Sequence, residues 1–230
     1  MTPEGAEGSP EGADGYMIRT IQGRWFPRCA VSLLAITLAI AAGRAPVAAW
    51  AAAAPPEAVT PEAAESAARK FEQIAEAHDS GESFGTVRLS ELEANSYLAY
   101  ELADSIPAGV SDIALQFTPG RISGSSVMDF DKLKEGMRVP FHPVADFLLR
   151  GVHTVGVEGS TSGMQGIGQF QLERVLLDGV ELPQMVVDYM IEQYLRPRYP
   201  SAAINQPFVL PFSVDSFRPG TGALTLTGRK

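Results

Sequence analysis

After Gly109, apolar and polar residues alternate in paired runs, which is the pattern of antiparallel β-hairpins. The three pairs of runs that we identify are 110–117 with 121–130, 152–158 with 168–177, and 207–217 with 223–227. Residues 159–166, which are rich in glycine and serine, separate the two runs of the second pair, and we expect them to form a flexible hairpin tip. Because each run is apolar on one side only, the resulting sheet must have one face covered by other elements.

Three segments have the features of helices that can supply this cover. Residues 61–78 are alanine-rich, with a proline at the start and Gly81 beyond the end. Ser90 and Glu93 have the spacing of a capping box, which predicts a second helix from Ser90. Residues 183–195 form the clearest amphipathic helix, and Asp178-Gly179 before it is a strong turn signal. The sequence therefore predicts an α+β fold, in which a long curved antiparallel sheet built from hairpins wraps around an amphipathic helix.

The N-terminal part of the chain has the organisation of an export signal. Met17 opens a segment with three arginines, an apolar run at 30–42 follows, and small residues at Ala49-Trp50-Ala51 suit a cleavage site. The run is shorter than the roughly 20 residues of a membrane span, which favours cleavage near Ala49–Ala51 over anchoring. We expect residues 1–16 to be untranslated or disordered, 17–51 to be a signal peptide, 52–61 to be a linker and 62–230 to be a single α+β domain. The expected location is the periplasm or cell envelope.

Charge and cysteine content exclude several classes of function. The chain has 18 Lys and Arg against 27 Asp and Glu, and a formal net charge of −9. This acidity argues against nucleic-acid binding, which needs a basic surface, and against docking on anionic lipid by charge alone. The only cysteine, Cys29, precedes the apolar run of the export signal. The exported part would then have no disulfide, thiolate metal site or cysteine nucleophile.

No catalytic or metal-binding pattern is recognisable in the sequence. The three histidines lack metal-ligand spacing, and the carboxylates near Asp129 and Asp131 are too few for a calcium site. Gly159-Ser160-Thr161-Ser162-Gly163 does not have the spacing of a hydrolase nucleophile elbow. We therefore predict no enzyme activity, no metal and no cofactor.

Four short motifs nevertheless resemble those of one family of exported bacterial proteins. They are LSELEANSYL at 89–98, PGRISG at 119–124, LLDGVELP at 176–183 and PFVLP at 207–211. In this order they resemble the LmeA-like phospholipid-binding family, which is related to the TULIP superfold. The resemblance spans roughly residues 84–229 and implies a curved sheet around a helix with an apolar groove for acyl chains, and it brings no catalytic residues.

The apolar sheet face and the helix at 183–195 are the candidate walls of such a groove. Burial of each CH₂ group contributes about 0.8 kcal/mol, and flexible methionines adapt to acyl chains of different shape. The candidate lipid-binding residues are Leu115, Phe117, Met128, Phe130, Phe170, Leu172, Met185, Val186, Met190 and Tyr194. Met164 and Ile167 are candidates for transient membrane contact.

The resulting hypothesis is an exported envelope protein that carries or senses phospholipid, or another acyl-chain lipid, without catalysis. The alternative is an envelope structural or protein-interaction module, with an unknown protein partner, in which the same apolar residues form a closed core.

Overall fold

The computed structural model describes residues 58–135, 149–196 and 204–229. The predicted export signal and most of the linker at 52–61 lie outside these residues. The helical elements are α2 (Pro61–Ser80), α3 (Glu91–Tyr100), the 3₁₀ turn η3 (Ala103–Ser105), α4 (Phe130–Glu135), α6 (Gln184–Met190) and the π-helical turn η4 (Ile191–Leu195). The strands are β1 (Thr86–Ser90), β2 (Val110–Thr118), β3 (Arg121–Asp129), β4 (Val152–Met164), β5 (Ile167–Leu177), β6 (Val180–Glu181), β7 (Pro207–Val209), β8 (Val214–Gly220) and β9 (Ala223–Gly228).

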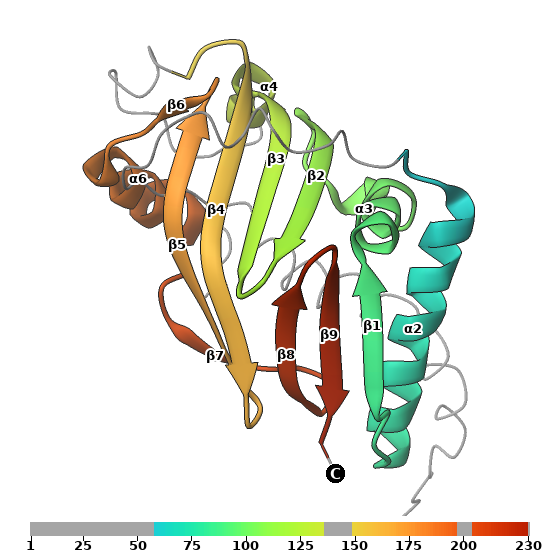
Figure 1. Cartoon of the computed structure of the whole chain (residues 1–230). Coiled ribbons are helices and arrows are strands. Elements are labelled where there is room, and N and C mark those ends of the chain that lie inside the picture. The colour runs from blue at the N-terminus through green and yellow to red at the C-terminus, as the bar shows by residue number, and fades with distance from the viewer. Residues whose placement is uncertain (1–57, 136–148, 197–203, 230) are drawn as a thin grey trace, which may run out of the picture.

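All nine strands belong to one open antiparallel sheet organised around β4 (Figure 1). One edge of β4 pairs with β5 from Val155 to Met164. The other edge pairs first with β3, from Val152 to Ser160, and then contacts β8 through the pair Gly163 and Phe217. The β2–β3 and β8–β9 hairpins therefore lie end to end along β4. The predicted α+β class and antiparallel hairpins are confirmed.

The tips of these two hairpins are joined by backbone hydrogen bonds. The Gly222 N–H donates to the Phe117 carbonyl (3.0 Å), and the Gly120 N–H donates to the Pro219 carbonyl (3.2 Å). These bonds connect the backbones of the two hairpins where their tips meet, so the sheet is continuous from one hairpin to the other. The predicted turns at 118–120 and 178–179 are also confirmed, and Asp178 and Gly179 both have the positive φ that a tight hairpin turn requires.

One face of the sheet, which we call the inner face, carries most of the buried apolar side chains. Three clusters of buried side chains lie on it: the α6 cluster, the α3 cluster and the β8 cluster. The α6 cluster consists of Met128, Phe130, Leu149, Val155, Val157, Phe170, Leu172, Val175, Val187, Met190, Ile191 and Ile204. The α3 cluster consists of Ala67, Leu89, Ala94, Tyr97, Leu98, Leu102, Leu115 and Phe117. The β8 cluster consists of Ile74, Phe84, Val87, Leu210, Val214 and Phe217.

Helix α3 is attached to the outer edge of β2. Two of its side chains make hydrogen bonds to the β2 backbone of the kind that a neighbouring strand would make. The side-chain amide of Asn95 accepts from the Leu115 N–H (2.6 Å) and donates to the Leu115 carbonyl (3.0 Å). One helical turn earlier, Glu91 Oε1 accepts from the Phe117 N–H (2.5 Å). Four residues of helix rise about 6 Å and two residues of strand about 6.8 Å, so the two bonds fit together.

The N-terminus of α3 is held by the predicted capping box, which also joins it to α2. The Ser90 hydroxyl accepts from the Glu93 N–H, and Glu93 Oε2 accepts from the Ser90 N–H. Glu93 Oε1 also accepts from Lys70 Nζ (2.5 Å) and the Ser66 hydroxyl (2.7 Å) on α2. Burial alone would raise the pKa of Glu93, but these hydrogen bonds outweigh it and lower the pKa to about 2.

The prediction of a flexible tip at 159–166 is wrong, because β4 continues to Met164 and only Gln165 and Gly166 form the turn. The glycines serve packing across the sheet. A Cβ atom on Gly159 would lie 2.5 Å from Cζ of Phe170, and one on Gly163 would overlap the ring of Phe217. Glycine inside a strand can mark a close approach of this kind, which the composition of one segment cannot distinguish from a loop.

Two smaller predictions also need correction. The predicted strand 207–217 is divided into β7 and β8, because the chain turns at Phe212 and Ser213, which both have positive φ. Phe130, predicted as the last residue of a strand, begins helix α4, although its side chain is buried as expected.

Substitution of Asn95 by alanine should lower the free energy of unfolding by about 2–4 kcal/mol, because it leaves a buried N–H and a buried carbonyl of Leu115 unpaired. Chemical denaturation followed by circular dichroism measures this loss. Gln171→Ala, at an exposed position of β5, is the control and should stay within about 0.5 kcal/mol of the unsubstituted protein. Equal stability of the two variants would contradict the role of Asn95.

Gly163→Ala should cost about 1–3 kcal/mol of stability through overlap with Phe217. The same substitution in a Phe217→Leu background should cost much less, because the smaller side chain leaves room for the methyl group. Thermal unfolding of the four proteins in this cycle tests the contact. An unchanged melting temperature for Gly163→Ala alone would instead support a flexible tip.

Candidate functional site

The α6 cluster is the candidate site because it contains most of the predicted lipid-binding residues. Met128, Phe130, Phe170, Leu172 and Met190 are buried members of it, and Val186 is partly buried against it. These side chains come from two separate parts of the sequence, one containing β3 and α4 and the other containing β5 and α6. The structure thus brings six of the ten predicted residues to one place.

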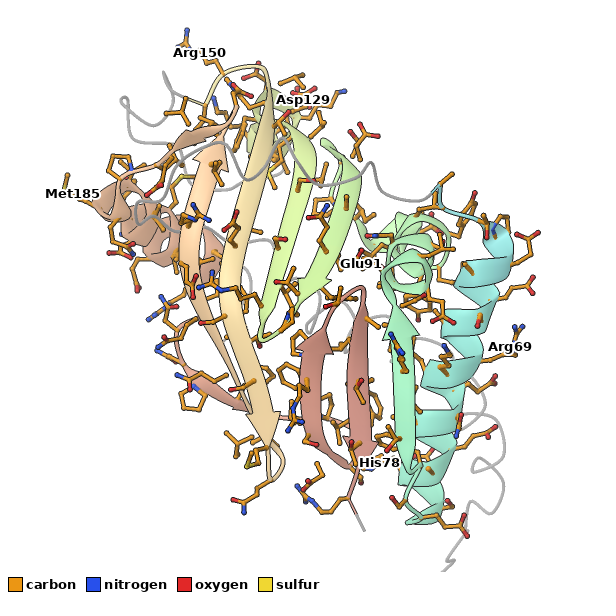
Figure 2. The ribbon with its side chains drawn as sticks, in the orientation of Figure 1. Arg69, His78, Glu91, Asp129, Arg150 and Met185 are labelled. Atoms are coloured by element: carbon orange, nitrogen blue, oxygen red, sulfur yellow. The ribbon has the colours of Figure 1, made fainter. Side chains whose placement is uncertain are left out.

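Three of the other four predicted residues lie elsewhere. Leu115 and Phe117 belong to the α3 cluster, because β2 is separated from β4 by β3 and is covered by α3. Met185 is 80% exposed, and Figure 2 shows it pointing away from the sheet. It precedes the fully buried Val187 by two residues, which turns it about 200° around the helix axis. The side chain of Tyr194 lies outside the described part of the chain.

Several residues of the cluster are absent from the predicted set. Val155, Val157 and Val175 follow the period-two pattern of their strands, so the sequence did contain a signal for them. Val187 and Ile191 lie on the predicted apolar face of the helix. Leu149 and Ile204 belong to no regular pattern, and only the structure places them in the cluster.

A buried hydroxyl group also faces this region of the inner face. Ser126 is 1% exposed, and its Oγ atom has no hydrogen-bond partner among the described residues. It shares a strand face with Met128, and its cross-strand partner is Val155, so it borders the α6 cluster. A hydroxyl group buried without a partner costs about 1–3 kcal/mol. This cost suggests that the hydroxyl group has a role beyond packing.

Helix α6 covers the cluster and is irregular at its end. It has only seven residues and is followed by the π-helical turn η4, in which the Arg196 N–H donates to the Ile191 carbonyl five residues earlier. Turns of this kind are rare in proteins, but a large share of those that occur lie at functional sites. Val187, Met190 and Ile191 face the sheet at this point. The irregular turn therefore coincides with the covered cluster.

A polar cluster lies beside the α6 cluster at the start of β4, which is the upper end of the sheet in Figure 1. His153 Nδ1 lies 2.7 Å from Asp178 Oδ2, and Nε2 lies 2.7 Å from the Arg150 carbonyl oxygen. Both partners are acceptors, so the full set of bonds requires the protonated imidazolium ring. The ring also contacts Phe130, a member of the α6 cluster, at 5.9 Å between centroids.

This arrangement shifts the pKa values of both partners. The hydrogen bond with Asp178 is the largest effect on His153 and raises its pKa; partial burial opposes the rise, while the Arg150 carbonyl and the charges of Asp178 and Asp131 favour it. The pKa of Asp178 is lowered, chiefly by the bond with His153 and then by the Thr154 N–H. The two opposite shifts favour the charged form of each partner, and the pair connects the start of β4 to the β5–β6 turn.

No protein-family model and no curated protein sequence matches the chain. Among the described residues, no helix has the length and apolar character to cross a membrane. The same residues contain no group of three or more His, Cys, Asp or Glu side chains arranged to hold a metal ion. The resemblance to LmeA-like proteins accordingly stays a prediction.

The His153 pair predicts a pH dependence of stability. Because the pKa of His153 is higher in the folded than in the unfolded protein, its contribution is complete below the unfolded value of about 6.5 and is lost as pH rises through the folded value. NMR titration should show His153 titrating above 6.5, and Asp178→Asn should return it toward that value. A titration of His153 that Asp178→Asn does not change would contradict the pair.

Proposed function

We propose that this protein is an exported lipid-binding protein of the bacterial envelope that holds acyl chains of phospholipid between the sheet and helix α6. It acts as a carrier or sensor and catalyses no reaction. In this proposal the sheet curves around α6 in the manner of TULIP-like proteins, and the inner face forms the wall of the binding groove. The lipid head group stays at the polar rim.

The composition of the α6 cluster supports binding of acyl chains. Its twelve buried members are all apolar, and Met128 and Met190 face it from the sheet and from the helix. Burial of a chain contributes about 0.8 kcal/mol per CH₂ group, and methionine side chains adjust to chains of varied length. Burial of an acyl chain needs no polar side chain inside the cluster.

The observation that carries the proposal is the unpartnered hydroxyl of Ser126 at the border of this cluster. A closed apolar core loses stability by burying such a group. A phospholipid, in contrast, has ester carbonyl oxygens next to its acyl chains, and one of them can accept a hydrogen bond from Ser126 Oγ. The hydroxyl is then satisfied in the lipid-bound state.

The alternative function is an envelope structural or interaction module with a closed core. The observation that favours it is the low exposure of the cluster, whose members are at most 9% exposed. In this case the described residues of the cluster pack against one another without a ligand. The protein then functions by binding another protein with its exposed residues. The two functions differ in whether lipid accompanies the purified protein.

Met190→Asp should reduce co-purified lipid at least tenfold, because a carboxylate in the cluster opposes burial of an acyl chain. The protein is expressed as the full chain, purified from the bacterial envelope and examined by native mass spectrometry with lipid extraction. Met185→Asp is the matched control: it makes the same change on the same helix at an exposed position, and it should retain lipid at the unsubstituted level.

Because Met190→Asp also threatens the fold, Ser126→Ala provides a second test. With lipid bound, loss of one hydrogen bond should weaken retention about two- to tenfold. In a closed core the same change would raise the free energy of unfolding, and no bound lipid would be detected with either protein. A clean lipid-free mass for the unsubstituted protein, together with a more stable Ser126→Ala variant, would replace the proposal with the interaction module.

A further inference from the structure

The outer face of the β4–β5 hairpin is polar along most of its length. Ser162 pairs with Gln169, Ser160 with Gln171, and Glu158 with Arg174, the last as an ion pair. Arg121 on β3 adds an ion pair to Glu173 (2.5 Å). A solvent-facing side is the expected place for such residues in an antiparallel sheet.

The last cross-strand pair before the turn breaks this pattern. It consists of Met164, 66% exposed, and Ile167, 48% exposed. Ile167 pairs in turn with Val209 of β7, which is 76% exposed. Cross-strand partners project from the same face, so the three side chains form one exposed apolar surface at the lower end of the sheet. We call these three residues the tip patch. The β4–β5 turn and β7, which carry it, lie together at the lower end of the sheet in Figure 1.

The structure holds the tip patch firmly in place. The Gly166 N–H in the turn donates to the Asp215 carbonyl (2.8 Å), and the Gly166 carbonyl accepts from the Leu210 N–H (2.8 Å). These bonds join the turn to β8 and to the connection between β7 and β8. The three apolar side chains are therefore presented together on a fixed backbone.

A cation lies beside the tip patch. The Arg229 guanidinium group contacts Gly166, at the position where any other residue would carry its Cβ atom. The Arg229 N–H donates to the Ser213 carbonyl (2.8 Å), which fixes the chain at this point. The turn thus combines exposed apolar side chains with a positive charge, in a protein whose net charge is −9.

We propose that the tip patch docks on the surface of a phospholipid bilayer. Met164, Ile167 and Val209 insert among the lipid head groups, and Arg229 binds a lipid phosphate. Apolar side chains with a cation at their border have the chemistry of the bilayer interface, where apolar burial is combined with attraction to phosphate. Because the protein is acidic, insertion of the apolar residues contributes most of the binding.

A protein partner fits the tip patch less well. A stable protein interface buries about 800 Å² on each partner, and three side chains at the end of a hairpin supply a small part of such an area. A bilayer needs no complementary partner surface and accepts a small protruding patch. A second copy of this chain, docked at the same residues, is the competing occupant.

This surface is separate from the site of the proposed function. Ile167 and Val209 lie on the outer face, whereas the α6 cluster lies on the inner face of the same sheet. The neighbouring Phe208 projects inward and packs against both the α6 and β8 clusters. Membrane docking and lipid retention can therefore be tested, and can fail, independently.

The test is flotation of the full chain with vesicles of phosphatidylcholine, alone or mixed in equal parts with phosphatidylglycerol. Substitution of Met164, Ile167 and Val209 by serine should reduce partition at least tenfold on both vesicle types. The matched control, Val152→Ser with Val180→Ser, changes two valines that are 63% and 67% exposed and lie outside the tip patch. It should partition as the unsubstituted protein does.

Arg229→Ala should weaken partition about fivefold on the mixed vesicles and less on phosphatidylcholine alone. Circular dichroism confirms that each variant is folded, and co-purified lipid is measured in parallel. Equal partition of the tip variant and its control would overturn the proposal, whatever the lipid content. Sedimentation that shows a dimer in solution, lost in the tip variant, would assign the patch to a second copy and also overturn it.

Discussion

The fold depends on how the backbone N–H and carbonyl groups at the outer edge of β2 are hydrogen-bonded. Leu115 is buried at this edge, where no further strand from the described part of the chain is hydrogen-bonded, and its N–H and carbonyl groups bond to the side-chain amide of Asn95. With Glu91 one turn earlier, helix α3 supplies three hydrogen bonds in the spacing of a strand. The same helix begins in the capping box at the end of β1 and is bonded to α2 through Glu93. One short helix therefore sets the relative positions of β1, β2 and α2, and loss of its contacts would expose an edge prone to pairing with other chains.

A second constraint follows from the length of β4, which must pair with two different hairpins along one edge. The β2–β3 and β8–β9 hairpins meet tip to tip, so the inner face is continuous although no single strand spans it on that side. Each stretch of this face then needs its own cover. Helix α6 covers the part under β3 to β5, while α3 and α2 cover the part next to β1 and β2. Glycines at 159 and 163 let the rings of Phe170 and Phe217 lie directly on the sheet.

Local signals in the sequence predicted the elements well. The capping box, the Asp178-Gly179 turn and the amphipathic helix are each set by a few neighbouring residues, and each is confirmed. The errors concern neighbours that are distant in the sequence. Alternation assigns Leu115 to the apolar face, but cannot say that α3 rather than α6 covers it. The composition of residues 159–166, rich in glycine and serine, is that of a loop. The glycines are explained by the rings of Phe170 and Phe217, which lie outside this segment and so could not be considered with it. The structure therefore gathers most of the predicted sheet and helix residues into one cluster. It separates Leu115 and Phe117, which another helix covers, and Met185, which lies on the exposed side of α6.

The walls of the α6 cluster differ in how strongly they are held, and this bears on how a ligand would enter. The sheet wall is fixed by the ladders of β3, β4 and β5 and by the His153–Asp178 pair at its upper end. Helices α2 and α3 both have side-chain N-caps, from Thr60 and Ser90, whereas α6 begins at Pro183 without one among the described residues. A helix of seven residues is also too short to be stable by itself, so α6 depends on its packing against the cluster. Elements with few interactions of their own open at low cost in free energy. Under the lipid-binding function proposed above, we therefore expect α6, rather than the sheet, to move when an acyl chain enters.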